Sequence, residues 1–430
     1  MAGARTQAMQ SVNKTGATSL PAVTGAGVRM LIYSHDTFGL GHLQRCLKIS
    51  RALTKRYPEL AILLVTGSPL VHRYELPAQV DYIKLPAVRK TGQEHYEARS
   101  LATSFARILN IRTRLLLEAV REFQPHVVLV DHSPTGMKGE MLPALQWLKE
   151  QEPRSTVILG LRDIIDDPSL VIPLWESQDV YGVLERLYTR VLVYGSPEVF
   201  DPVEAYHFSP ALKAKTHFCH YLLEEHRRRG SGGGTQRPRP SRPLVVVTIG
   251  GGDGAVETVI DPYVAMLTRH RDEIHFDSVI LSGPFVAAED LRRLRRAALG
   301  LPVMIKRFVP ETGSLFRRSS LVVATAGYNT TTEILSYGRR ALLIPRMLHR
   351  QEQLLRASKL AHLGLVTMLR PGDVTADGLF ISVTELLKDG REPLVAARAD
   401  GRIPLDGAVQ LVEWFRDVVA QHTCLPGDEA

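Results

Sequence analysis

The sequence predicts an α/β protein made of two domains, each a doubly wound, Rossmann-like parallel sheet covered by helices. Its 430 residues correspond to two or three domains of the usual ~150 residues. Short runs of β-branched residues alternate with amphipathic stretches, as in sheets built from βα units. Three of these runs lead directly into glycine-rich turns. Such turns place candidate ligand-binding loops at the carboxyl ends of strands.

The first half of the chain carries six predicted strands, with helices in most of the gaps between them. The strands cover residues 30–34, 62–66, 82–85, 127–130, 157–161 and 191–194. Residues 227–243 then break the periodicity, and their glycine, arginine and proline content is that of a linker. We therefore expect a disordered tail over residues 1–27, a first domain over residues 28–226 and this linker after it.

The second half predicts another sheet. Its strands cover residues 245–249, 278–281, 303–308, 322–325 and 341–344. An amphipathic helix follows over residues 408–419, where Leu411, Phe415 and Val419 are among the apolar positions. We expect a second domain over residues 244–405 and a C-terminal helix over residues 406–422.

The two glycine turns of the second half predict a nucleotide site. Backbone N–H groups and the positive end of a helix dipole after a strand form an arrangement that binds phosphate, and glycines let the backbone approach a diphosphate closely. Glu333, in the helix after the later turn, can accept hydrogen bonds from paired ribose hydroxyls. The candidates for diphosphate binding are Gly250, Gly251, Gly252, Asp253, Gly327, Asn329 and Thr330.

The third glycine turn, Gly39-Leu40-Gly41-His42, predicts a catalytic group. It follows the strand 30–34 and opens an amphipathic helix, so His42 lies at the edge where open α/β sheets bind ligands. An imidazole with a pKa of about 6.5 is a suitable general base at neutral pH. Asp131 and His132 follow the strand 127–130 at the same edge. They are candidates for orienting an acceptor or a water, and capping of a turn accounts for them equally well.

These residues resemble the motifs of the two-domain GT-B glycosyltransferases, in particular the lipid II-forming N-acetylglucosaminyltransferase type with its family 28 C-terminal domain. The chain is still more similar to bacterial proteins described only as predicted glycosyltransferases, over residues 28–420. Gly39, Gly41 and His42 match the acceptor-side loop, and residues 250–252 match the second glycine loop. Residues 327–333 and Glu352-Gln353 match the donor-sugar signature, although the family often has glutamine in place of Glu352.

The resemblance implies a GT-B fold whose C-terminal helix crosses back to the first domain. It also implies that Glu352 and Gln353 contact the donor sugar. We expect inverting transfer of a sugar from a nucleoside diphosphate sugar, with uridine diphosphate as the expected carrier, to an unidentified hydroxyl acceptor in polysaccharide, glycolipid or other glycoconjugate synthesis. We expect no metal and no cofactor, since the nucleotide sugar is a substrate.

Two rival functions stay open at this point. Gly39-Leu40-Gly41-His42-Leu43-Gln44-Arg45-Cys46 and Asp131-His132 also resemble the nucleotide-sugar hydrolase of pseudaminic acid synthesis. That enzyme shares the fold and the leaving group, but water is its nucleophile. The third possibility is a non-catalytic nucleotide-sugar-binding protein, against which the intact His42 argues mildly.

Each candidate residue also has a purely structural alternative. His42 would equally cap its helix or hydrogen-bond across the interdomain cleft, and Glu333 would be an ordinary first-turn acid. Gln353 would belong to the polar face of a helix over residues 350–362, while Asn329 and Thr330 are common N-cap residue types.

Two further segments are less specific. The acidic run from Arg162 to Pro168 is explained by an Asp-Pro turn rather than by a metal site. Residues 88–93 have the composition of an exposed loop and are a candidate mobile acceptor loop.

The net charge of +8 is concentrated in segments that we expect to be flexible. Residues 227–242 contain six arginines and no acid, and Arg5 and Lys14 lie in the tail, so the folded body is about neutral. This distribution argues against a nucleic-acid-binding groove and is compatible with weak contact to an anionic membrane surface. The three cysteines are far apart and lack metal-ligand spacing. We expect a cytoplasmic protein, with a peripheral position at the inner face of the plasma membrane as an alternative.

Overall fold

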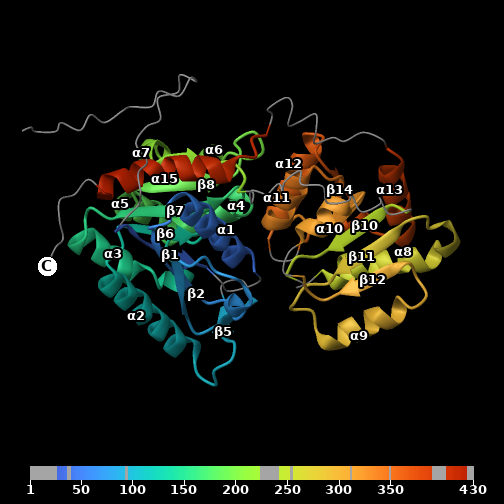
Figure 1. Ribbon diagram of the computed structural model, residues 1–430, viewed down its shortest axis with the longest axis horizontal. Helices are drawn as coiled ribbons and strands as arrows, with labels where there is room; N and C mark the ends of the chain where they lie inside the picture. Colours follow the sequence, from blue (N-terminus) through green and yellow to red (C-terminus); the bar gives the residue numbers. More distant parts are fainter. Residues whose placement is uncertain are drawn as a thin grey trace, which may run out of the picture.

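The computed structural model describes residues 27–35, 40–92, 95–222, 242–251, 255–309, 312–347, 350–389 and 403–423. Residues 1–26 of the predicted tail (1–27) and residues 227–241 of the predicted linker (227–243) lie outside this part of the chain, as do residues 223–226, Gly39, Gly252 and Asp253. Two parallel sheets, each with helices packed around it, form two domains that face each other (Figure 1). The prediction of two doubly wound α/β domains is confirmed.

The sheet of the first domain has seven parallel strands in the order β3-β2-β1-β6-β7-β8-β9. Its inner strands are buried along nearly their whole length, which explains why their sequences are continuous apolar runs. The strands are β1 (Arg29–Ser34), β2 (Ala61–Thr66), β3 (Val80–Lys84), β6 (Val127–Asp131), β7 (Thr156–Arg162), β8 (Arg190–Tyr194) and β9 (Thr216–Phe218).

The helices of this domain fill the connections between the strands. They are α1 (Gly41–Arg56), α2 (Phe105–Phe123), α3 (Leu142–Gln151), α4 (Pro168–Ser177), α5 (Val180–Leu187), α6 (Pro202–Ala205) and α7 (Pro210–Ala214), with short 3-10 turns η1 (Val71–Arg73) and η2 (Met137–Gly139). Between β3 and α2 the chain forms an antiparallel hairpin of β4 (Val88–Gly92) and β5 (His95–Ala98).

This hairpin corrects the expectation of a loop over residues 88–93, of which Gln93 lies outside the described part. Strand pairing orders residues 88–92, and Arg99, just past β5, places its guanidinium carbon 5.1 Å from the ring centroid of Phe285 in the second domain. The hairpin segment thus reaches the other side of the cleft.

The sheet of the second domain has six parallel strands in the order β12-β11-β10-β13-β14-β15. The strands are β10 (Leu244–Thr248), β11 (Asp277–Leu281), β12 (Val303–Lys306), β13 (Leu321–Ala324), β14 (Ala341–Leu343) and β15 (Thr367–Met368). The helical segments are η3 (Val256–Ile260), α8 (Asp261–Arg269), η4 (Arg271–Glu273), α9 (Ala288–Ala297), α10 (Gly313–Arg318), α11 (Tyr328–Tyr337), α12 (Glu352–His362), η5 (Pro371–Asp373) and α13 (Ala376–Lys388). The predicted strand over residues 303–308 ends two residues earlier than expected.

Both sheets reverse their strand order at a central pair of strands. In the first domain the order reverses between β1 and β6, and in the second it reverses between β10 and β13. At such a switch point the loops after the two strands diverge and leave a crevice for ligands. His42, at the start of α1, and Asp131, at the end of β6, lie at the first switch point, and Gly250 and Gly327 lie at the other.

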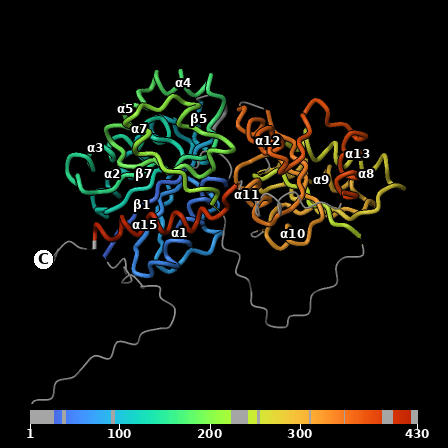
Figure 2. The backbone as a smooth tube through the Cα atoms, turned by 90° about the horizontal axis from the view of Figure 1, so that it is seen from above, coloured from blue at the N-terminus to red at the C-terminus, as the bar shows by residue number. Residues whose placement is uncertain are grey.

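The C-terminal helix α15 (Gly407–Thr423) packs against α1 of the first domain, as the tube drawing shows (Figure 2). The hydroxyl of Tyr57 donates a hydrogen bond to the Val412 carbonyl (3.2 Å), and the rings of Tyr57 and Phe415 lie 5.9 Å apart. The chain therefore returns to the first domain after completing the second.

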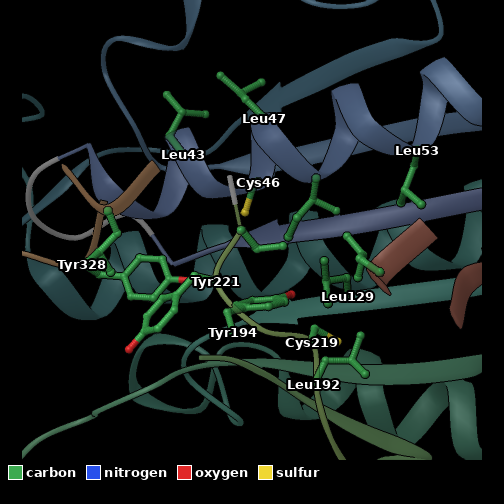
Figure 3. Packing of buried hydrophobic residues seen from close by; sticks show 14 of the residues in the cluster. Leu43, Cys46, Leu47, Leu53, Leu129, Leu192, Tyr194, Cys219, Tyr221 and Tyr328 are labelled. Carbon is green, nitrogen blue, oxygen red and sulfur yellow. The ribbon is translucent and has the colours of Figure 1, made fainter. Parts of the chain in front are cut away.

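The apolar core continues across the boundary between the domains. Tyr328, at the start of α11, packs beside Tyr221 of the first domain with ring centroids 6.1 Å apart, close to Cys46 and Leu43 of α1 (Figure 3). The guanidinium carbon of Arg45 lies 5.3 Å from the centroid of the Tyr328 ring, within the range of a cation–π contact. Among the described helices, none is long and apolar enough to cross a membrane.

Candidate active site

A cleft of about 950 Å³ lies between the two domains, and residues of both line it. The first domain contributes the start of α1, and the second contributes the turns after β10 and β13 and the first turns of α11 and α12. A volume of this size is at the upper end of small-molecule sites, so it accommodates a large or two-part ligand. Of the predicted site residues, His42, Glu333, Glu352 and Gln353 all line this cleft.

His42 is held by Asp131. Its Nδ1 lies 2.6 Å from Asp131 Oδ2, and the carboxylate is completely buried. A carboxylate accepts hydrogen bonds only, so Nδ1 carries the proton and Nε2 keeps its lone pair. Asp131 was expected to orient an acceptor or a water. In the structure it orients the imidazole of His42 instead.

Arg45 completes this group. It lies one turn after His42 on α1, so both side chains project from the same face of the helix. Its Nε and Nη2 donate to the two oxygens of Asp131, each at 2.8 Å, in a bidentate pair that fixes the plane of the carboxylate. The spacing Gly-x-Gly-His-x-x-Arg was the available sequence signal, but it did not reveal which acid Arg45 would bind.

Burial decides the protonation state of this group. It lowers the pKa of His42 to about 4, and the hydrogen bond and negative charge of Asp131 oppose that shift only in part. Burial also disfavours ionisation of Asp131, but the charge of Arg45 and the hydrogen bond from His42 outweigh it and hold the pKa of this carboxyl well below its usual range. At neutral pH the group is thus a neutral imidazole beside a balanced ion pair.

Two more histidines pack against His42. The ring centroids of His132 and His35 lie 5.1 and 5.6 Å from that of His42. His132 follows β6 with a φ of +69°, a left-handed conformation that turns the chain sharply at the strand end. Burial lowers the pKa of both His35 and His132 well below the ordinary value, so these rings are neutral as well.

The glycine turns of the second domain lie next to each other at the cleft. Gly250 has a φ of +66°, which favours glycine, and a Cβ added there would lie 3.9 Å from Thr330 Oγ1 of the other turn. Gly327 caps α11 with extended backbone angles and no side-chain bond to the helix N-terminus. These turns bring Gly250, Gly251, Gly327 and Thr330 to the lining of one cleft. Gly252 and Asp253 lie outside the described residues.

Asn329 reaches across to the first domain. Its side-chain amide donates to the Gly41 carbonyl at 2.9 Å and to Gln44 Oε1 at 3.3 Å. It lies inside the first turn of α11, as Thr330 does, so neither residue is the N-cap that one structural alternative proposed. In this arrangement the Asn329 amide joins the two domains beside the predicted diphosphate site.

Glu333 lines the cleft from α11 and has contacts on both sides. Thr312 Oγ1 donates a hydrogen bond to its Oε2, and Lys48 Nζ of the first domain lies 3.7 Å from its Oε1. The carboxylate is about a quarter exposed. It is therefore accessible to hydroxyl groups of a ligand in the cleft.

Glu352 and Gln353 begin α12 and are almost buried. Gln353 Oε1 accepts from the backbone N–H of Arg346 at 3.0 Å, which leaves its amide nitrogen for a ligand. Glu352 Oε2 lies 2.8 Å from Arg162 Nη1 of the first domain, an ion pair without hydrogen-bond alignment. The carboxylate that stands where the resembled family often has glutamine is thus neutralised by an arginine from the other domain.

The acidic segment after β7 docks onto α12. Arg356 Nε and Nη2 donate to the two oxygens of Asp163 at 2.9 and 2.7 Å, and both side chains are completely buried. Asp166 Oδ1 accepts from the backbone N–H of Gln351 at 2.6 Å. From the sequence, this segment was expected to form a turn. In the structure it also forms a contact between the domains, for which a single sequence carried no signal.

Within the described residues, no cluster of three or more histidine, cysteine or acidic side chains is arranged to hold a metal ion. In the acidic run, the carboxylate of Asp163 accepts hydrogen bonds from Arg356, and that of Asp166 accepts one from the backbone N–H of Gln351.

Comparison with known proteins agrees with this architecture. Residues 245–408 match the model of the glycosyltransferase family 28 C-terminal domain. A 164-residue stretch is 29% identical to UDP-N-acetylglucosamine--N-acetylmuramyl-(pentapeptide) pyrophosphoryl-undecaprenol N-acetylglucosamine transferase of Exiguobacterium sibiricum, covering 37% of this chain and 43% of that protein. The chain spans less than half the length of the first curated relatives that it matches.

Two other matches extend over both domains. An uncharacterized glycosyltransferase of Methanosarcina mazei is 24% identical over 328 residues, covering 73% of this chain and 79% of that protein. The crystal structure of MurG from Acinetobacter baumannii superposes with a TM-score of 0.55 at 14% identity, covering 90% of this chain and 99% of the other. The second domain therefore resembles the glycosyltransferase family 28 C-terminal domain, and the paired parallel sheets have the GT-B fold.

Proposed function

We propose that this protein is an inverting glycosyltransferase that moves a hexosyl or N-acetylhexosaminyl group from a nucleoside diphosphate sugar, a uridine one, to a hydroxyl acceptor of a polysaccharide, glycolipid or other glycoconjugate. One observation carries the proposal. The imidazole of His42, oriented by Asp131 at 2.6 Å, lines the same cleft as the glycine turns at Gly250 and Gly327. The names of the relatives support the class of donor. We place the reaction in the cytoplasm.

The chemistry follows from the two sides of the cleft. The acceptor hydroxyl gives its proton to Nε2 of His42 while its oxygen forms a bond to the anomeric carbon. The bond from that carbon to the diphosphate oxygen breaks at the same time, and the electron pair leaves with the diphosphate. Attack from the face opposite the leaving group inverts the anomeric centre in one displacement.

The second domain stabilises the leaving group. Backbone N–H groups at the start of α11 and the positive end of its dipole favour a diphosphate beside Gly327. Arg307 and Arg317 also line the cleft and add positive charge to it. Because these groups can balance the diphosphate, we propose that transfer needs neither a metal nor a cofactor.

Release of nucleoside diphosphate from a panel of UDP-, dTDP-, GDP- and ADP-sugars, without any acceptor, tests this function. We expect one nucleotide sugar to bind with little release, and release to start when hydroxyl acceptors are added. Rapid release to free sugar in the wild type that disappears in His42→Ala would make water the nucleophile and the protein a hydrolase. Binding without turnover for every acceptor tested would favour a non-catalytic role.

A further inference from the structure

The first domain faces Glu333 through one side of helix α1. Asn329 of α11 donates from its side-chain amide to Gln44 Oε1 of α1 at 3.3 Å. One turn further along both helices, Lys48 Nζ lies 3.7 Å from Glu333 Oε1. These two contacts, one turn apart on each helix, hold the Lys48 ammonium opposite the Glu333 carboxylate across the boundary between the domains.

The gap between Lys48 and Glu333 has the size and the polarity of a site for a hydroxyl group. Their separation of 3.7 Å is longer than a direct hydrogen bond, which spans about 2.7–3.2 Å. An ammonium only donates hydrogen bonds and a carboxylate only accepts them, whereas a hydroxyl does both. A hydroxyl oxygen about 2.8 Å from each atom can therefore accept from Lys48 Nζ and donate to Glu333 Oε1.

The neighbouring contacts leave these two atoms to a ligand. Thr312 Oγ1 donates to Oε2 of Glu333, so Oε1 is the oxygen that faces Lys48. Within the described part of the chain, Lys48 Nζ forms no hydrogen bond. Both side chains are partly exposed and line the cleft, so a ligand bound in the cleft can reach them.

We propose that Lys48 is a specificity-determining residue for the donor, which binds one ribose hydroxyl of the nucleotide together with Glu333. This inference rests on the proposed function, because it takes the ribose to lie at Glu333. The hydroxyl accepts from the ammonium while it donates to the carboxylate, and both hydrogen bonds are charge-assisted. The donor site then extends over both domains, and a deoxyribose lacking this hydroxyl loses both bonds.

Calorimetry with matched nucleotides tests this role of Lys48. The full-length protein is titrated with UDP and with its 2′-deoxy and 3′-deoxy forms, and likewise with the three forms of GDP and of ADP. Each hydrogen bond to a charged group contributes roughly a factor of 10, so we expect one deoxy form to bind about 100-fold more weakly than the ribonucleotide. The deoxy form that binds more weakly identifies the hydroxyl.

Variants separate recognition of the hydroxyl from a purely structural role. Lys48→Met removes the donor, so the ratio of the two Kd values should fall to about 10, while Lys48→Arg should retain part of the difference. Lys55→Met changes an exposed lysine two turns later on α1 and should leave the ratio unchanged. If Lys48 only held the domains together, its loss would raise both Kd values by the same factor and preserve the ratio.

The outcomes distinguish the role of Lys48 from the proposed function. Nucleotide binding with the same ratio in Lys48→Met as in wild type, or a wild type that binds all three forms equally, would overturn the role of Lys48 alone. Absence of binding by every nucleoside diphosphate would reject the proposed function and this inference with it.

Discussion

The buried ion pair between Asp163 and Arg356 should hold the two domains in the arrangement seen here, and removal of its arginine should open the cleft. Arg356→Met keeps most of the side-chain length but leaves the Asp163 carboxylate without its cation. The remaining donors to that carboxylate are the Ile164 backbone N–H at 2.8 Å and the Tyr221 hydroxyl at 3.2 Å. Breaking a buried pair by removing one partner costs about 3–5 kcal/mol.

This cost should fall on the closed arrangement rather than on the fold of either domain. Opening exposes Asp163 to water without disrupting a strand, because the carboxylate lies at the end of β7 on the face turned toward α12. A penalty of about 3–5 kcal/mol corresponds to a factor of roughly 150 to 5,000 in the closing equilibrium. Even a strongly closed wild type would then become mostly open.

Small-angle scattering of the full-length protein measures the change. We expect the radius of gyration to rise in Arg356→Met, while the urea midpoints of unfolding change little. The double variant Asp163→Asn/Arg356→Met contains no unpaired charge and should return most of the way to the wild-type scattering. A single variant with wild-type scattering, whether or not its stability falls, would refute the idea that this pair closes the cleft.

Three further predictions concern the catalytic and nucleotide-binding groups. Burial lowers the pKa of His42 to about 4, and a general base must be deprotonated to act. We therefore expect kcat/KM to stay constant from neutral pH down to roughly one unit above this pKa and to fall at lower pH. A fall in kcat/KM that begins near pH 6.5 would contradict this environment for His42. Asp131→Asn should reduce kcat by about 10²- to 10⁴-fold, because the amide can donate to Nδ1 of His42 and favour the tautomer whose proton is on Nε2. The Kd of the donor should stay unchanged. Undiminished turnover would remove Asp131 from the mechanism. Glu333→Gln should weaken UDP binding in calorimetry by about tenfold or more, since hydrogen bonds to a charged group contribute about 1.5–3 kcal/mol, and an unaltered Kd would remove the ribose assignment.

Most of the strands could be predicted because each is marked by a short run of apolar residues in the local sequence. β1, β6 and β10 are continuous apolar runs, and their predicted limits agree with the structure to within one residue. β9 and β15 were missed because edge strands of three and two residues carry too little periodicity to be distinguished from loops. The hairpin of β4 and β5 was taken for a loop because its glycine and lysine content hides the pairing, which depends on contacts between strands.

The turns and candidate residues of the site could be predicted from the sequence, but the contacts between their side chains could not. Glycine turns after strands mark the switch points of parallel sheets, so the neighbourhood of His42, Gly250 and Gly327 could be inferred from the sequence. The hydrogen-bond and ion-pair partners of the site residues could not be inferred in this way. Arg45 binds an acid 86 positions away, and Arg356 binds one 193 positions away. No local pattern encodes such pairs.

The sequence by itself determined the two α/β domains, the glycine turns and the residue types for phosphate, ribose and base chemistry, because strand propensity and turn chemistry act over a few residues. The tertiary structure alone decided which acid holds His42, that Arg162 neutralises Glu352, and that the segment after β7 joins the domains. The physical reason is that burial and charge pairing depend on what the rest of the chain brings within a few ångströms. Those same contacts set the protonation state of His42.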